Sequence, residues 1–218
     1  MAFQYSPKIA TDGLILYLDS ANSRSYPGSG TTWSDISRNN NDAVLLNSSF
    51  SSDNMGSMVL NGTNAYAYGI SPSIGSEGTV NIWFKQSVAG TNKGLFSINP
   101  ETPGIGYALF YIGSGNQLTI YNGTSYSSSV PISDTYSWNM ATYAWSGASA
   151  SIYINADDST SVTSSISFPT FGDYYVGVYS TLSPTSFFNG RISNVQVYNR
   201  MLSFDEISKN YLAMRSRY

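Results

Sequence analysis

The sequence contains no cysteine and no histidine in 218 residues. Disulfides, thiolate nucleophiles, imidazole general bases and the usual zinc sites are therefore excluded. Charged residues are also scarce, at 11% against roughly 25% in a typical domain. Because 41% of the residues are hydrophobic and 15% aromatic, the chain can still bury a sizeable core, and disorder is not expected.

Long hydrophobic runs are missing as well. No stretch approaches the roughly 20 apolar residues that span a bilayer, and the N-terminus lacks the basic and apolar regions of a signal peptide. We therefore expect a chain that folds in a cytoplasm and has no membrane partner.

The net charge of −3 is unevenly distributed, with −6 on residues 1–190 and +3 on residues 191–218. Nucleic-acid binding is disfavoured because contacts to phosphates need a basic surface. Arg215 and Arg217 are candidates for docking on an acidic partner. The alternative is that these cations complement the dipole of a C-terminal helix.

Alternating hydrophobic and polar residues dominate the chain. In residues 79–85, Val80, Ile82 and Phe84 share one face, while Asn81 and Trp83 lie on the other. Such runs recur between glycine, asparagine and aspartate turns and predict an all-β, two-sheet antiparallel jelly-roll sandwich formed by a single domain, residues 1–218.

Two hairpins are predicted from turn signals. Residues 58–60 and 65–68 flank Asn61-Gly62, and residues 138–145 and 151–155 flank a short turn.

The last strand contains a break in parity. Ile192 is even-numbered, whereas Val195 and Val197 are odd-numbered, so a regular strand would place them on opposite faces. We expect a β-bulge near Ser193-Asn194 that returns all three side chains to the inner face.

One helix is predicted, over about residues 203–215. Ser203 and Glu206 form a capping box, and Leu202 and Ile207 fit a hydrophobic staple. Apolar residues follow at helical spacing, so the helix should pack on the sandwich. Residues 14–18 are apolar on both faces, which implies that either this helix or a second subunit covers the outer face.

Three segments resemble a known family. The first, residues 13–37, contains Gly13-Leu14-Ile15-Leu16-Tyr17-Leu18-Asp19 and Trp33-Ser34-Asp35-Ile36-Ser37. The second is residues 79–85, and the third, residues 188–207, begins with Phe188-Asn189-Gly190-Arg191-Ile192. Together they resemble the laminin-G-like, concanavalin A-like superfamily, in particular the stand-alone structural proteins of tailed bacteriophages. The resemblance implies a jelly roll that binds glycans, proteins or other capsid and tail components. Some members bind calcium and others hydrolyse glycosides, but a fold does not carry its functions with it.

Catalytic and metal-binding groups are few. Glycoside hydrolysis needs two facing carboxylates, but only Glu77, Glu101 and Glu206 are present, and Glu206 belongs to the helix cap. Asp157 and Asp158 are adjacent, so on a strand they would point to opposite faces, and a turn is the favoured interpretation. Oxygen ligands for calcium could come from Asp157, Asp158 and Asn155, or from Asp19 and Asn22, but these residue types are also the usual turn residues, which is the favoured interpretation. We predict that the protein is not an enzyme and holds no cofactor or metal.

Aromatic side chains are the candidates for glycan contact. Tyr66, Tyr68, Tyr174 and Tyr175 could stack on sugar faces. The alternative is that they are ordinary core or strand residues, because most of the 18 tyrosines in a sandwich of this size must be partly buried.

The leading hypothesis from the sequence is a non-enzymatic virion protein, a capsid decoration or accessory protein assembled in the host cytoplasm. Its partners would be the major capsid protein or tail proteins, or a second copy of the chain. The alternative is a lectin-like tail or receptor-binding adhesin that recognises a surface glycan.

Overall fold

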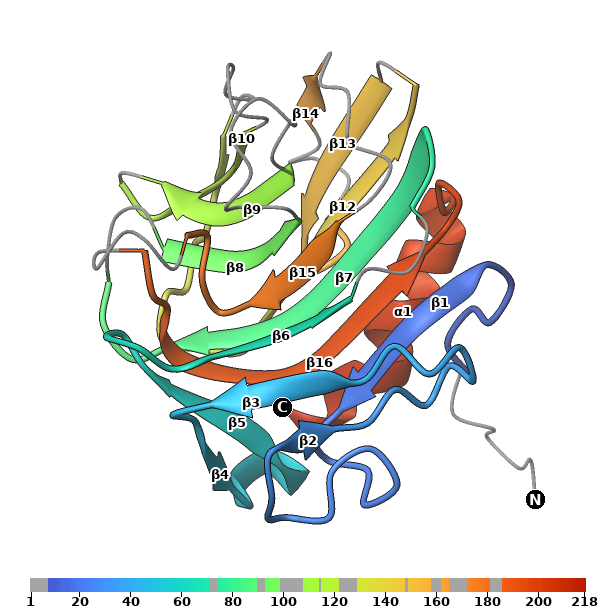
Figure 1. Cartoon of the computed structure of the whole chain (residues 1–218). Coiled ribbons are helices and arrows are strands. Elements are labelled where there is room, and N and C mark those ends of the chain that lie inside the picture. Colours follow the sequence, from blue (N-terminus) through green and yellow to red (C-terminus); the bar gives the residue numbers. More distant parts are fainter. Residues whose placement is uncertain are drawn as a thin grey trace, which may run out of the picture.

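The computed structural model describes residues 8–70, 74–89, 93–98, 108–113, 115–121, 129–147, 149–157, 162–164, 172–180 and 186–218, and the side chains of 108–111 and 162–164 are not part of this description. Two antiparallel sheets of eight strands each face one another (Figure 1). The predicted all-β sandwich with one C-terminal α-helix is confirmed. Within the described residues, no helix has the length and hydropathy to span a bilayer.

The first sheet has the order β14-β13-β12-β7-β16-β5-β4, and β1 also pairs with β16. Its strands are β1 (Leu14–Asp19), β4 (Ser49–Ser51), β5 (Ser57–Asn61), β7 (Glu77–Gln86), β12 (Asn139–Ser146), β13 (Ser149–Ile154), β14 (Val162–Ser164) and β16 (Asn189–Tyr198).

The second sheet has the order β11-β10-β9-β8-β15-β6-β3-β2. Its strands are β2 (Thr32–Trp33), β3 (Ala43–Leu46), β6 (Tyr66–Ile70), β8 (Lys93–Ile98), β9 (Ala108–Gly113), β10 (Gln117–Tyr121), β11 (Val130–Pro131) and β15 (Asp173–Val176). A short 3₁₀ turn, Asp53–Met55, links β4 and β5.

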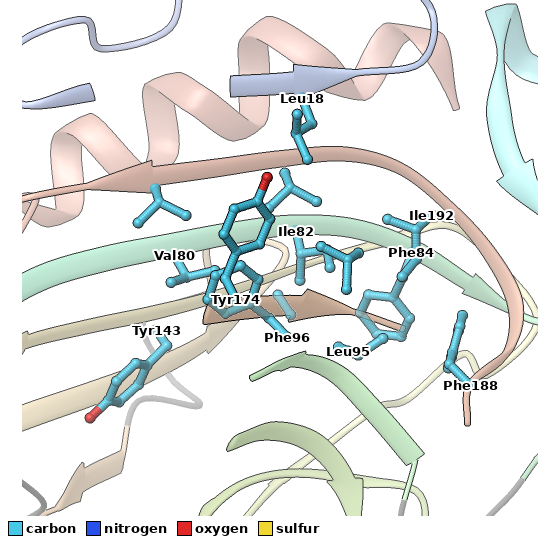
Figure 2. Packing of buried hydrophobic residues seen from close by; sticks show 14 of the residues in the cluster. Leu18, Val80, Ile82, Phe84, Leu95, Phe96, Tyr143, Tyr174, Phe188 and Ile192 are labelled. Carbon is cyan, nitrogen blue, oxygen red and sulfur yellow. The ribbon is translucent and has the colours of Figure 1, made fainter. Parts of the chain in front are cut away.

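The main core lies between the sheets and consists of the inward-facing residues of both (Figure 2). Val80, Ile82 and Phe84 of β7 meet Leu95 and Phe96 of β8, and all five are at most 3% exposed. The alternation predicted for residues 79–85 is thus the pattern of a strand with its even-numbered residues in the core.

The predicted bulge in β16 is confirmed, because the register against β7 shifts between Ile192 and Asn194. The shift leaves Ile192, Val195 and Val197 fully buried in the same core. The carbonyl of the bulged Ser193 accepts hydrogen bonds from the backbone amide and the hydroxyl of Ser20, at 2.9 and 2.8 Å.

One predicted hairpin is confirmed and the other is wrong. β12 and β13 pair directly. In contrast, β5 lies in the first sheet and β6 in the second, so the turn after Asn61 is a corner between sheets. The Asn61 side chain accepts hydrogen bonds from the amides of Thr63, Asn64 and Ala65, a local arrangement that does not determine which strand the next segment joins.

The helix α1 (Phe204–Met214) starts at the predicted cap and continues into a 3₁₀ turn, Arg215–Arg217. The Ser203 hydroxyl accepts a hydrogen bond from the Glu206 amide, and the Glu206 carboxylate accepts one from the Ser203 amide. Leu202 and Ile207, the predicted staple, belong to one buried cluster.

This second cluster fills the space between α1 and the outer face of the first sheet. Trp83 of β7 stacks on Tyr211 of the helix at 5.5 Å and on Tyr218 at 4.4 Å. Leu14 and Tyr17 of β1, both partly buried, pack against the same cluster. The doubly apolar strand is therefore covered by the chain's own helix.

We expect Gly94→Ala to lower the free energy of unfolding by about 1–3 kcal/mol, because an added Cβ would overlap the backbone of Val178 and Tyr179. Gly75→Ala is the matched control, since nothing lies within 4 Å of its Cβ position. Urea unfolding measures both, and equal midpoints for the two variants would contradict the packing described.

The pKa of Glu206 is lowered to about 2, chiefly by the hydrogen bonds from Arg200, with further bonds from Ser203. Because the folded pKa lies below the ordinary 4.5, the stability that Glu206 contributes is full above about pH 4.5 and is lost as the pH falls towards 2. Unfolding measured across this range should depend less on pH in Glu206→Gln than in the native protein.

Candidate functional site

The outer face of the second sheet carries partly exposed tyrosines. Along β6, Ala67 and the other odd-numbered residues face the core, and Tyr66 and Tyr68 face outward. On the neighbouring β15, Tyr175 also faces outward, opposite Tyr68 in the antiparallel register. The period-2 geometry of the two strands thus brings three tyrosines from two distant parts of the chain to one surface.

The three rings form a triangle whose sides are nearly equal, and we call Tyr66, Tyr68 and Tyr175 the tyrosine triangle. Ring centroids lie 6.1 Å apart for Tyr66 and Tyr68 and 6.0 Å apart for each of the other pairs. Both pairs with Tyr175 are stacked, at 25° and 26° between planes. Such offset contacts hold the rings in place without burying them fully.

A continuous strip of side chains crosses the sheet through this triangle. Thr32 of β2 lies opposite Val44 of β3, Val44 opposite Tyr68, Tyr68 opposite Tyr175, and Tyr175 opposite Ser97 of β8. Val44 is 41% exposed, which is high for a strand valine. The strip therefore presents aromatic and aliphatic carbon to solvent.

Polar groups flank this apolar surface. Thr32 is exposed at the edge strand, and Asp173 is exposed two residues before Tyr175. Ser97, by contrast, is fully buried, and its hydroxyl donates to the carbonyl of Val178 at 2.9 Å, so it does not reach the surface. A stacking surface with a few polar groups at its border is the general composition of a site that binds a polar ring compound.

Tyr174 must be removed from the predicted contacts, because it is fully buried. Figure 2 shows it among the core residues, and its ring stacks on Phe96 at 6.0 Å. Its hydroxyl donates to the carbonyl of Asn41 at 2.7 Å, and burial raises its pKa, so that it remains a donor. Tyr174 and Tyr175 are adjacent in a strand and so point to opposite faces.

The structure also changes the interpretation of the basic C-terminal segment. Arg217 forms two hydrogen bonds with the Asp19 carboxylate, at 2.8 and 2.9 Å, and Asp19 is almost completely buried. Arg191 pairs with Asp53, and Arg200 with Glu206. Much of the segment's positive charge is therefore neutralised by ion pairs within the molecule, whereas Arg215 is exposed at the helix C-cap.

The side chains considered for catalysis or calcium also have structural partners. Asp19 is occupied by Arg217 and by the Tyr17 hydroxyl at 3.1 Å. Glu77 accepts a hydrogen bond from Ser146, and Asn155 bonds with Met140 and Asn139. Glu101 and Asp158 lie outside the described residues. Among the residues that are described, no three acidic side chains gather around a metal-sized space.

Two residues beside the tyrosine triangle, the exposed Val44 and the buried Phe187, were not predicted from the sequence. Val44 reads as an ordinary strand residue, and the Phe187 ring packs 5.9 Å from Tyr66. Only the pairing of β3 with β6, across about 20 residues of chain, places Val44 beside Tyr68. No local pattern in the sequence contains that information.

Solved structures share this fold. A sialidase of Trypanosoma rangeli matches with a TM-score of 0.71 and 17% identity over 94% of this chain, which spans about a third of the sialidase chain. Domain 4 of an extracellular arabinanase from Geobacillus stearothermophilus, solved in complex with arabinotriose, matches with a TM-score of 0.70 and 16% identity, covering 92% of this chain and 98% of that domain. The receptor-binding domain of a botulinum neurotoxin C/D mosaic serotype matches with a TM-score of 0.64 and 16% identity, covering 93% of this chain and 51% of that one.

At these identities the solved structures support the fold alone. No curated protein matches the sequence. A family model does match, over residues 60–208, which is more than half of the chain and includes β6, β7, β15 and β16. The chain therefore belongs to the concanavalin A-like lectin/glucanase superfamily, within its laminin G group.

Proposed function

We propose that the protein is a non-catalytic glycan-binding module and that the tyrosine triangle is its contact surface. The observation that carries this proposal is the placement of Tyr66, Tyr68 and Tyr175 at 6.0–6.1 Å from one another on an outward sheet face. Aromatic faces carry partial negative charge, and the C–H groups on the flat face of a sugar complement it. Thr32 and Asp173 supply hydrogen-bonding groups at the border.

The size of the surface argues for a short oligosaccharide. The triangle and Val44 form a compact platform, so few sugar rings can touch aromatic carbon at once. Tyrosine provides large contact area at a low cost in conformational entropy, because its ring has only two rotatable bonds. The arabinotriose complex of the arabinanase domain, which has the same fold, supports testing a sugar of this length first.

Placement in a virion stays a prediction, since it rests on the sequence resemblance. Mass spectrometry of purified particles, with copy number, tests it separately from glycan binding.

We expect Tyr68→Ala to weaken binding to the best ligand on a glycan array at least tenfold, about 1.4 kcal/mol, because Tyr68 contacts both other tyrosines and Val44. Tyr68→Phe should retain most of the affinity, since it keeps the ring. Titration calorimetry with that ligand measures all three proteins.

The matched control is Tyr136→Ala, which removes a tyrosine that is 57% exposed outside the triangle. Circular dichroism verifies that each variant is folded. The proposal is refuted if the native protein binds no glycan on the array, or if Tyr68→Ala and Tyr136→Ala bind equally well.

A further inference from the structure

A cavity of about 680 Å³ lies away from the tyrosine triangle, and its wall is formed by residues of the last turn of α1, of β1 and of the loop that follows Asp35. Apolar residues form part of its wall: Leu14 of β1, Met214 of α1, and Ile9 in the segment before β1. Met214 is 2% exposed, and all three belong to or pack against the cluster beneath the helix. The cavity therefore has a fixed apolar side.

The charged residues in the wall are all positive. Lys8, Arg38 and Arg217 line the cavity, and no carboxylate is among the lining residues that the structure describes. This is unusual for a chain whose net charge is −3. The Asp19 carboxylate neutralises the charge of Arg217 and orients its guanidinium, with both Nη1–Oδ distances below 3 Å.

Lys8 and Arg38 differ from Arg217, because neither forms an ion pair within the described part of the chain. The loop that carries Arg38 is well fixed. The Asp35 carboxylate accepts hydrogen bonds from the amides of Tyr17 and Ser37, the Ser37 hydroxyl and the Asn41 amide, at 2.8–3.1 Å. The Asp35 carboxylate is therefore held by backbone amides of β1 and of the loop itself.

We propose that this cavity binds a small organic anion that carries an apolar ring or chain. Lys8 and Arg38 would meet the anionic group, for which a guanidinium offers planar, paired donors, and the wall formed by Leu14 and Met214 would take the apolar part. The volume lies within the range of about 300–1,000 Å³ that is typical of small-molecule sites. A macromolecular partner would require about 800 Å² of its own surface to be buried, which favours a small ligand here.

The probe for this proposal is anilinonaphthalene sulfonate, an aromatic anion whose fluorescence rises in apolar surroundings. We expect saturable binding to the native protein and at least tenfold weaker binding to the double variant Lys8→Glu with Arg38→Glu. The control double variant, Arg24→Glu with Lys209→Glu, makes the same change in net charge at two exposed positions outside the lining and should bind as the native protein does.

Methyl-labelled methionine adds a local readout by nuclear magnetic resonance. The probe should shift the methyl signal of Met214, assigned through Met214→Leu, and leave that of Met55, which is 66% exposed elsewhere, unchanged. Absence of saturable binding to the native protein, equal affinities of the two double variants, or a shift of Met55 without Met214 would each overturn the proposal. Because Tyr68→Ala leaves this cavity intact, its affinity for the probe should remain native, which separates this site from the glycan surface.

Discussion

Strand β16 is the element on which the rest of the fold depends. It pairs with β7 along nearly its whole length, and on its other side with β5 through residues 189–192 and with β1 through residues 194–198. The bulge at Ser193 separates these two partners. The Ser193 carbonyl, which the disrupted ladder would leave exposed, is bonded by Ser20 just after β1. One extra residue thus allows a single strand to join the first strand and the middle of the chain in one sheet.

The outer faces of the two sheets have different roles. The first sheet is covered by α1, and Trp83 lies between the helix and the sheet, in contact with Tyr211 and Tyr218. No helix in the described part of the chain covers the second sheet, and Tyr66, Tyr68 and Tyr175 remain partly exposed. Because a helix shields one face, aromatic residues there pack in a second buried cluster, whereas those on the open face form the surface that we propose for glycan contact.

The ion pairs of the described residues connect the C-terminal region to the body of the domain. Arg217 and Asp19 connect the end of the chain to β1, and Arg200 connects the helix cap to the segment before β1 through Glu206 and Asp12. Removing one partner of the Asp19–Arg217 pair would leave a charge without compensation in a largely buried place. Lys8 and Arg38, which form no ion pair within the described part of the chain, lie at the proposed anion site.

The sequence by itself determined the period-2 strands, the parity break that becomes the bulge, and the Ser203–Glu206 cap, because each depends on residues close together in the chain. Tertiary structure decided the rest. It placed β5 and β6 in different sheets, buried Tyr174 while leaving Tyr175 outside, and engaged Arg217 with Asp19 across 198 positions. The physical reason is that alternation specifies two faces without saying which one meets the core, and strand order depends on pairings between distant segments that no local pattern encodes.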